Sequence, residues 1–209
     1  MAYSPFVPLR VFSSFTMLEG AIEPKAVAKA ARDRGFPAIA VCDRNGLYGA
    51  MAFGDACKAA GIQPIVGTLL SVARPGQRLA SGAPLIDWLA LYAQDEDGYN
   101  NLCALVSAAH LGRPVEQDPH VTLSDLAGKT DGLICLTGGG EGALARLLAG
   151  EQATAGNDYV QQLGALFAGR LYIELSRRGD AAETAAEKAL IDMAYARALP
   201  LGATNPASF

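Results

Sequence analysis

The chain has 209 residues, of which 51% are hydrophobic and 18% are charged, and its formal net charge is −4. This size and apolar content can bury the core of one α/β domain, and no apolar run reaches the roughly 18 residues that a membrane span needs. Because DNA-binding surfaces carry clustered basic side chains, a net negative charge predicts that any DNA contact by this segment is minor.

Four cysteines are widely spaced, and no two of them form a CxxC pair. This spacing excludes a zinc knuckle and a redox motif, and it predicts buried thiols in a reducing cytoplasm. The N-terminus lacks the charged and then apolar pattern of a secretion signal. The cysteines are Cys42, Cys57, Cys103 and Cys135.

Short apolar runs alternate along the chain with longer Ala-rich segments of helical period, which is typical of βα units around a parallel sheet. The predicted strands are Val7–Ser13, Ala38–Asp43, Ile65–Val72, Trp88–Gln94, Gly132–Thr137, Leu171–Leu175 and Leu201–Thr204. The predicted helices are Pro24–Arg34, Leu47–Ala60, Glu96–Ala109, Gly142–Ala149, Ala153–Phe167 and Ala181–Ala198. The pattern therefore predicts seven strands in one α/β domain over residues 1–209.

Two segments between these elements are rich in turn-forming residues. Ala73–Leu85 contains Pro, Gly and Ser, and we expect it to form a β-ribbon loop or a surface excursion. Gly112–Pro119 is a second loop, and both are too short to be domain linkers. After the last helix, Leu201–Phe209 is predicted as a strand with no closing helix, so we expect the chain to be the N-terminal piece of a longer protein.

The predicted strand ends carry little catalytic chemistry. A barrel of repeated βα units places its catalytic residues at the C-terminal ends of its strands. Here the side chains at or near those ends are an aromatic, a cation, an aliphatic and a hydroxyl, so the sequence points away from catalysis. They are Phe12, Arg44, Leu69 and Ser208.

Three residues near strand or helix ends are candidates for a site. Asp43 could bind a metal or orient a base, but pairing with an arginine or capping the following helix is the favoured interpretation. His110 ends a predicted helix, where satisfying a carbonyl is favoured over metal ligation. His120 follows Pro119 in a predicted loop, so we expect it at the surface.

A glycine run at 138–142 follows a strand and opens a helix, as phosphate cradles do. It lacks the Lys-Ser/Thr of a Walker loop, and Glu141 would repel a phosphate, so a tight turn is the simpler interpretation. The sequence also contains no Gly-x-Ser-x-Gly elbow and no Cys–His or Ser–His pairing, so nucleophilic catalysis is unsupported.

Several ordered motifs cover nearly the whole chain. They are FVPLRVFSSFTMLEGA at 6–21, PAIAVCD and NGLYG at 37–49, AAGIQPIVG at 59–67, GYNNL at 98–102, GLICLTG at 132–138, YIEL at 172–175 and ATN at 203–205. In this order they resemble the PHP (polymerase and histidinol phosphatase) domain of bacterial DNA polymerase III alpha subunits. The resemblance implies a distorted (βα)7 barrel, in agreement with the seven units counted from the pattern.

Metal-binding members of this family use His-x-His at the end of the first strand, Asp-His after the second, Glu after the third and Asp-x-His after the last. By resemblance, the corresponding positions are 10–12, 43–44, 69 and 206–208, where only Asp43 matches. Arginine charge opposes a divalent cation, so the resemblance predicts no catalytic residue, metal or cofactor in this segment. The vestigial positions are Arg10, Phe12, Glu19, Asp43, Arg44, Leu69, His110, Pro206 and Ser208.

The resemblance implies a scaffold role: stabilising the polymerase and docking its proofreading exonuclease subunit. The parent chain would carry out template-directed DNA synthesis as a nucleotidyltransferase, with Mg²⁺ in a polymerase domain beyond this segment. One alternative is a residual metal-dependent phosphoesterase built on Asp43, Glu19 and His110. Another is the PHP domain of an error-prone relative, which can carry an Asp-Arg-Asn segment like 43–45, although the region from Gly98 through His110 favours the replicative type.

Overall fold

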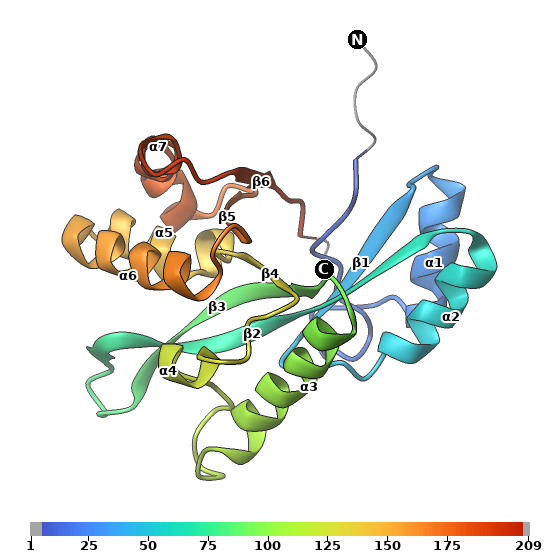
Figure 1. The fold of residues 1–209 in the computed structure, drawn as a ribbon, viewed down its shortest axis with the longest axis horizontal. Helices are drawn as coiled ribbons and strands as arrows, with labels where there is room; N and C mark the ends of the chain where they lie inside the picture. The colour runs from blue at the N-terminus through green and yellow to red at the C-terminus, as the bar shows by residue number, and fades with distance from the viewer. Residues whose placement is uncertain (1–5, 207–209) are drawn as a thin grey trace.

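The computed structural model describes residues 6–206 and is built around one curled sheet of six strands in the order β1-β2-β3-β4-β5-β6 (Figure 1). The strands are β1 (Ala38–Arg44), β2 (Gln63–Arg78), β3 (Pro84–Ala93), β4 (Leu133–Leu136), β5 (Leu171–Leu175) and β6 (Leu201–Ala203). The helices are α1 (Pro24–Asp33), α2 (Ala50–Ala60), α3 (Glu96–Leu111), α4 (Leu123–Leu126), α5 (Ala143–Ala149), α6 (Ala153–Leu166) and α7 (Ala181–Ala196). A short 3₁₀ turn spans Gly139–Glu141.

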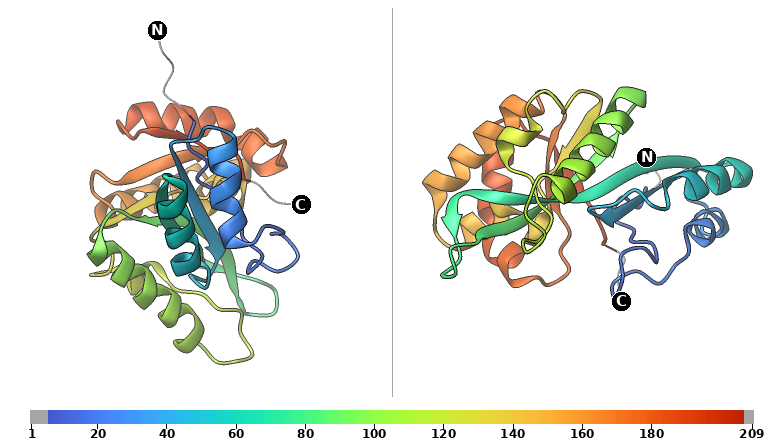
Figure 2. Two further views of the ribbon diagram at one scale, coloured as in Figure 1. Left: turned by 90° about the vertical axis from the view of Figure 1, so that its right-hand side faces the viewer. Right: turned by 90° about the horizontal axis from the view of Figure 1, so that it is seen from below.

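The helices lie against the sheet in three groups, one of which is α3 and α4, packed against β2 and β3. Helices α1 and α2 lie side by side beside β1 and β2, while α5, α6 and α7 gather at the opposite end of the sheet (Figure 2). None of the helices in the described part of the chain is long and apolar enough to cross a membrane.

The side chains of strand β1 alternate between two hydrophobic cores. Ile39 and Val41 pack against α1 and α2, whereas Ala40 and Cys42 face the inside of the curled sheet together with Phe12. Successive residues of a strand point to opposite faces, so a strand buried on both faces appears in sequence as a continuous apolar run.

The first predicted strand, Val7–Ser13, is wrong as a regular strand. The segment runs along β1 but is joined to it by separate backbone bonds, in which Ala40 N donates to Pro8 O (2.8 Å) and Cys42 N donates to Val11 O (2.9 Å). Pro8 has no N–H and cannot donate to a ladder. The described sheet therefore has six regular strands, and the seventh position of the barrel is filled by an irregular extended segment.

The expected all-parallel sheet is also corrected, because β3 runs antiparallel to both β2 and β4. The turn-rich segment 73–85 forms the end of a long β2–β3 hairpin, and a hairpin makes its two strands antiparallel. Of the two predictions for this segment, a β-ribbon loop or a surface excursion, the β-ribbon is confirmed. The short helix α4 was not predicted; it begins at a capping box made by Thr122 and Asp125.

Candidate functional site

A cluster of charged side chains joins parts of the chain that are far apart in sequence. It consists of Arg10 and Glu19 from the N-terminal segment, Arg44 at the end of β1, Glu141 after β4 and Glu174 in β5, and we call it the ion-pair cluster. Its members come together because the sheet curls and brings the N-terminal segment, which flanks β1, toward β5.

Arg10 lies at the centre of the ion-pair cluster and is 1% exposed. Its Nη1 donates to both carboxylate oxygens of Glu174, at 2.9 and 3.1 Å, and its Nη2 donates to Glu141 Oε2 at 2.8 Å. Burial by itself lowers the pKa of Arg10, but the Glu174 carboxylate, with smaller contributions from other groups, raises the pKa above its usual value. The guanidinium is therefore charged and fixed in place.

Glu174 is fully buried and its two oxygens are engaged on all sides. Besides the Arg10 guanidinium, the carboxylate accepts hydrogen bonds from Gly138 N (3.0 Å) and from Thr204 Oγ1 (2.6 Å). A buried carboxylate with this many donors is neutralised and hydrogen-bonded, as burial of charge requires. The Gly138 N–H is thus committed to a protein carboxylate, which argues against a phosphate cradle at this turn.

Arg44 forms the second half of the cluster. Its Nε and Nη2 donate to the two oxygens of Glu19 at 2.8 and 2.7 Å, and Nη2 also contacts Glu141 Oε1 at 2.5 Å. The guanidinium carbon lies 5.1 Å from the centre of the Phe12 ring and 4.5 Å from that of the Trp88 ring. Glu141 therefore bridges Arg10 and Arg44. The Phe12 and Trp88 rings also stabilise the position of the Arg44 guanidinium through cation–π contacts.

Asp43 makes neither of the two favoured interactions predicted for it. Its oxygens accept from Ser13 N (2.7 Å), Ser13 Oγ (2.6 Å) and Thr16 Oγ1 (2.7 Å), and it is 3% exposed. Helix α2 is preceded by Gly49 as its N-cap and has no side-chain cap, and no ion pair joins Asp43 to Arg10 or Arg44 within residues 6–206. Both interpretations were wrong because the donors on the segment after Arg10 fold back onto this carboxylate.

The other predicted positions are spread over the molecule. Leu69 and Phe12 are buried in the apolar inside of the sheet. His110 is exposed, and its Nε2 lies 2.9 Å from the Asn45 carbonyl oxygen, so it satisfies a carbonyl of a neighbouring loop instead of one in its own helix. Pro206 offers no donor atom, and Ser208 lies outside the described residues.

His120 was expected at the surface and is instead 4% exposed. Its neighbour Val121 pairs with β2, with Val121 N donating to Ser71 O at 3.0 Å and Ala73 N donating to Val121 O at 2.8 Å. This added pairing draws the loop against the sheet, and a local loop pattern in the sequence does not show it.

The residues of this site do not fit a divalent metal. Over residues 6–206, no group of three or more His, Cys, Asp or Glu is arranged to hold an ion. The carboxylates of the cluster face guanidinium groups, and Asp43 faces hydroxyl and amide donors. Buried N–H donors of Arg10 (Nε) and Arg44 (Nη1) also have no acceptor, and such positive groups repel a cation.

Two members of the cluster, Glu141 and Glu174, were missed as site residues. Glu174 is the single charged residue of an otherwise apolar and aromatic strand, LYIEL, and Glu141 is the single charged residue in a run of glycines. A lone acid in a buried strand indicates a fixed cationic partner, because an unpaired buried carboxylate is costly. That signal was present in the sequence, but the identity of the partner was not.

Comparison with known proteins places these observations in a family. The sequence profile of the family described as "PHP domain" matches residues 8–178. The chain is 36% identical over 209 residues to the DNA polymerase III subunit alpha of Caulobacter vibrioides, 33% identical to that of Escherichia coli K12 and 34% identical to the error-prone DNA polymerase of Symbiobacterium thermophilum. These alignments cover 96–100% of this chain but only 18–19% of each relative's length.

The fold is similar to a solved structure of a Bifidobacterium adolescentis protein described as a metal-dependent phosphoesterase. The TM-score is 0.58 with 12% sequence identity, and the match covers 98% of this chain and 88% of the other. At that identity the likeness concerns the fold, and it agrees with the distorted barrel architecture.

Proposed function

The chain belongs to the PHP domain family, and from this membership we propose that it is a metal-degenerate, non-catalytic PHP domain of a bacterial DNA polymerase III alpha subunit. The parent protein would carry out template-directed DNA synthesis, with its Mg²⁺ held in a separate polymerase domain. In this proposal the PHP domain stabilises the polymerase and docks the proofreading exonuclease subunit, and its own DNA contacts are minor.

The observation that supports loss of the metal site is the ion-pair cluster itself. Arg10 and Arg44 stand at positions where the family resemblance expects metal ligands, and both make ion pairs with carboxylates. A guanidinium supplies no electron pair to a metal. A carboxylate that already accepts from arginine would have to give up that pair before it could bind a cation.

The cluster also supports a structural role, because it fastens the N-terminal segment to β5 and to the turn at 139–141. Buried ion pairs fix one arrangement of the elements that carry them, and breaking one side of such a pair is costly. Arginine–glutamate pairs that join these elements can hold them in place without a bound metal.

Measuring the metal content of the intact protein tests the proposal. After dialysis against Mn²⁺ or Zn²⁺ and removal of free ion, we expect far less than one metal ion bound per PHP domain. Metal ions held by other domains should be bound equally by the wild type and by Asp43→Asn. We also expect no hydrolysis of a generic phosphodiester that depends on Asp43. One tightly bound metal per chain that disappears in Asp43→Asn would overturn the proposal.

A residual phosphoesterase is the second candidate, and one observation favours it: the fold is shared with a protein described as a metal-dependent phosphoesterase. The same experiment decides between the two functions, because Mn²⁺-dependent turnover that is lost in Asp43→Asn supports the phosphoesterase. The matched control is Asp55→Asn, which changes an exposed carboxylate of α2 in the same way.

The docking role has its own test. The cognate proofreading exonuclease, immobilised on resin, should retain the intact alpha subunit, and deletion of the PHP domain should abolish retention. Equal retention with and without the PHP domain would contradict docking by this domain while leaving the metal result untouched.

A further inference from the structure

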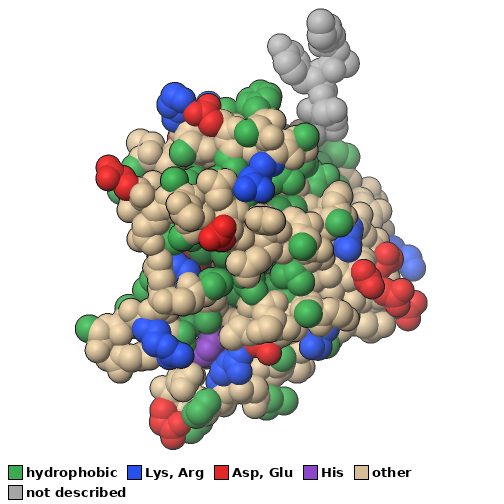
Figure 3. All heavy atoms as spheres, turned by 60° about the vertical axis from the view of Figure 1, so that its left-hand side comes forward, with side chains coloured by type: hydrophobic (Ala, Val, Ile, Leu, Met, Phe, Trp, Pro, Cys, Tyr) green, Lys and Arg blue, Asp and Glu red, His purple; other side chains and the backbone are tan. Residues whose placement is uncertain are grey.

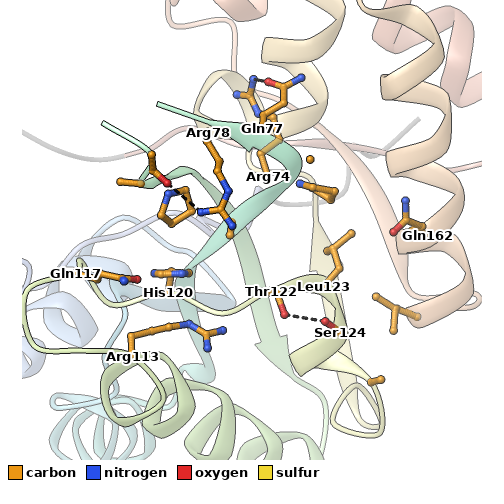
Figure 4. A pocket seen from close by; sticks show the side chains of 18 of the residues that line it. Arg74, Gln77, Arg78, Arg113, Gln117, His120, Thr122, Leu123, Ser124 and Gln162 are labelled. Carbon is orange, nitrogen blue, oxygen red and sulfur yellow. Dashed lines mark hydrogen bonds between the residues drawn. The ribbon is translucent and has the colours of Figure 1, made fainter. Parts of the chain in front are cut away.

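A hollow of about 1160 Å³ lies between the end of the β2–β3 hairpin, the loop and short helix at 113–127, and α6, and its lining includes no member of the ion-pair cluster (Figure 4). Its walls come from three separate stretches of sequence. It is somewhat larger than the range of about 300–1,000 Å³ that is typical of small-molecule sites. We call it the hairpin hollow.

The lining of the hairpin hollow is positively charged, although the whole chain carries a net charge of −4. Arg74, Arg78, Arg113 and His120 line it, and none of its lining residues is Asp or Glu. Figure 3 shows basic side chains on both sides of a histidine on this face, and Figure 4 shows Arg78 and Arg113 on opposite sides of His120.

Part of this charge is compensated from outside the lining. Both carboxylate oxygens of the buried Asp87 accept from Arg74, at 2.7 and 2.8 Å. Arg113 Nη2 contacts Asp125 at 2.5 Å, but its buried Nε has no acceptor. Arg78 makes no ion pair with a residue in 6–206; its Nη1 donates only to the Gly82 carbonyl, at 2.9 Å.

His120 also presents a free ring nitrogen. Its Nδ1 lies 2.8 Å from the Asp118 carbonyl oxygen, which can only accept, so Nδ1 carries the hydrogen. In the neutral ring Nε2 is then an acceptor; it makes no hydrogen bond to residues 6–206, and it donates to a phosphate oxygen only when both ring nitrogens carry a hydrogen. Ser81, Gln117 and Gln162 also line the hollow and can supply hydroxyl and amide donors.

From this arrangement we propose that the hairpin hollow is a binding site for a polyphosphate group, either free or carried by a nucleotide. Guanidinium groups pair with phosphate oxygens through two parallel hydrogen bonds. A polyphosphate concentrates several negative charges in one compact group. Carboxylates of an acidic peptide are instead spaced about 3.3 Å apart for each residue of an extended chain. A compact polyphosphate can contact Arg78, which has no ion pair with a residue in 6–206, and Arg113 on the opposite side of His120 at the same time.

Hydrogen–deuterium exchange of the intact protein, measured with and without sodium tripolyphosphate at constant ionic strength, tests this proposal locally. We expect slower exchange in peptides that cover 73–84 and 113–124. Arg78→Gln should raise the tripolyphosphate concentration that gives half of this protection by about tenfold or more, because a charge-assisted hydrogen bond is lost. Thermal unfolding of the variant checks that it is folded.

Arg34→Gln is the matched control. Arg34 is an exposed arginine that also donates Nη1 to a backbone carbonyl four residues away, that of Ala30, at 3.2 Å. It lies at the end of α1, so its removal should leave the protection at the hollow unchanged. Absence of protection, or protection that is equal in the wild type and in Arg78→Gln, would overturn the proposal.

Two further probes define the ligand. If dATP protects the two segments at lower concentration than tripolyphosphate, with the same dependence on Arg78, the ligand is a nucleotide. If dATP and tripolyphosphate protect the two segments at equal concentrations, the site recognises the polyphosphate group alone. Protection by a hexaglutamate peptide without any by tripolyphosphate would contradict the proposal and assign the hollow to an acidic peptide.

Discussion

Arg10 and Glu174 are 164 positions apart in the sequence, and their side chains form a buried ion pair with N–O distances of 2.9 and 3.1 Å. The pair joins a segment that makes no regular strand to the middle of β5. The ion pair therefore links this segment to β5, while the backbone bonds from Ala40 and Cys42 link it to β1.

Replacing Arg10 by methionine should lower the free energy of unfolding by about 3–5 kcal/mol, because Glu174 would remain buried without its cation. The double variant Arg10→Met, Glu174→Gln should recover part of this loss, since it removes the unpaired charge. Urea unfolding followed by circular dichroism measures both. Lys29→Met, which breaks the exposed Lys29–Asp33 pair, is the control and should have little effect. Equal stability of Arg10→Met and Lys29→Met would contradict a structural role for the buried pair.

The Asp43 carboxylate should anchor the loop that follows the N-terminal segment. Asp43→Asn keeps the size of the side chain but replaces one accepting oxygen by an NH₂ group that faces the Ser13 and Thr16 donors. We expect a loss of about 1–3 kcal/mol of stability and faster amide exchange over residues 13–20. Asp55→Asn should change neither quantity. Unchanged exchange over residues 13–20 in Asp43→Asn would show that these bonds do not hold the loop.

Gly138 adopts a left-handed backbone, with a φ of 88°, and a side chain there would overlap the Trp88 carbonyl. Gly138→Ala should therefore destabilise the fold and move Glu141 away from the two arginines. Gly164→Ala is the matched control, because a Cβ at this position in α6 meets nothing within 4 Å. Alanine in a helix is favoured over glycine, so this control should gain about 0.5–1 kcal/mol. Thermal unfolding would reveal the opposite signs, and the same sign for both variants would contradict the turn geometry.

Burial raises the pKa of the Cys57 thiol from 9.0 to about 11. In the unfolded chain the thiol ionises first, so the unfolded state binds fewer protons between pH 9 and 11 and stability falls as pH rises through that range. The contribution of this thiol is fully present below pH 9, and its loss has a limiting slope of about 1.4 kcal/mol for each pH unit.

The measurement compares urea unfolding at pH 8 to 10.5 for the wild type and Cys57→Ala. The slope of stability against pH should be shallower in Cys57→Ala, whatever its absolute stability. Equal slopes would mean that the thiol does not titrate differently in the two states.

Periodicity in the sequence predicted most of the elements, because strand and helix periods are local. Strand Leu171–Leu175 was predicted with its observed bounds, and the helix starting at Pro24 was predicted with its correct first residue. The ordered motifs also predicted the family, since they cover nearly the whole chain. The antiparallel direction of β3 was not predicted, because the apolar pattern of a strand carries no information on its orientation. The turn-rich segment 73–85 could have indicated it, since a hairpin makes its two strands antiparallel.

The composition of the candidate site was predicted only in part. Arg10, Glu19, Arg44 and Asp43 were named from the sequence as site positions, and Glu19 does pair with Arg44, but Glu141 and Glu174, which complete the ion pairs, were not named as site residues. Which acid meets which arginine depends on how the sheet curls, and a curl that joins positions 164 residues apart leaves no local pattern. The sequence by itself therefore determined the elements, the family and the cationic positions. Only the tertiary structure decided their partners, because a buried charge is stabilised by whichever opposite charge the packing brings to it.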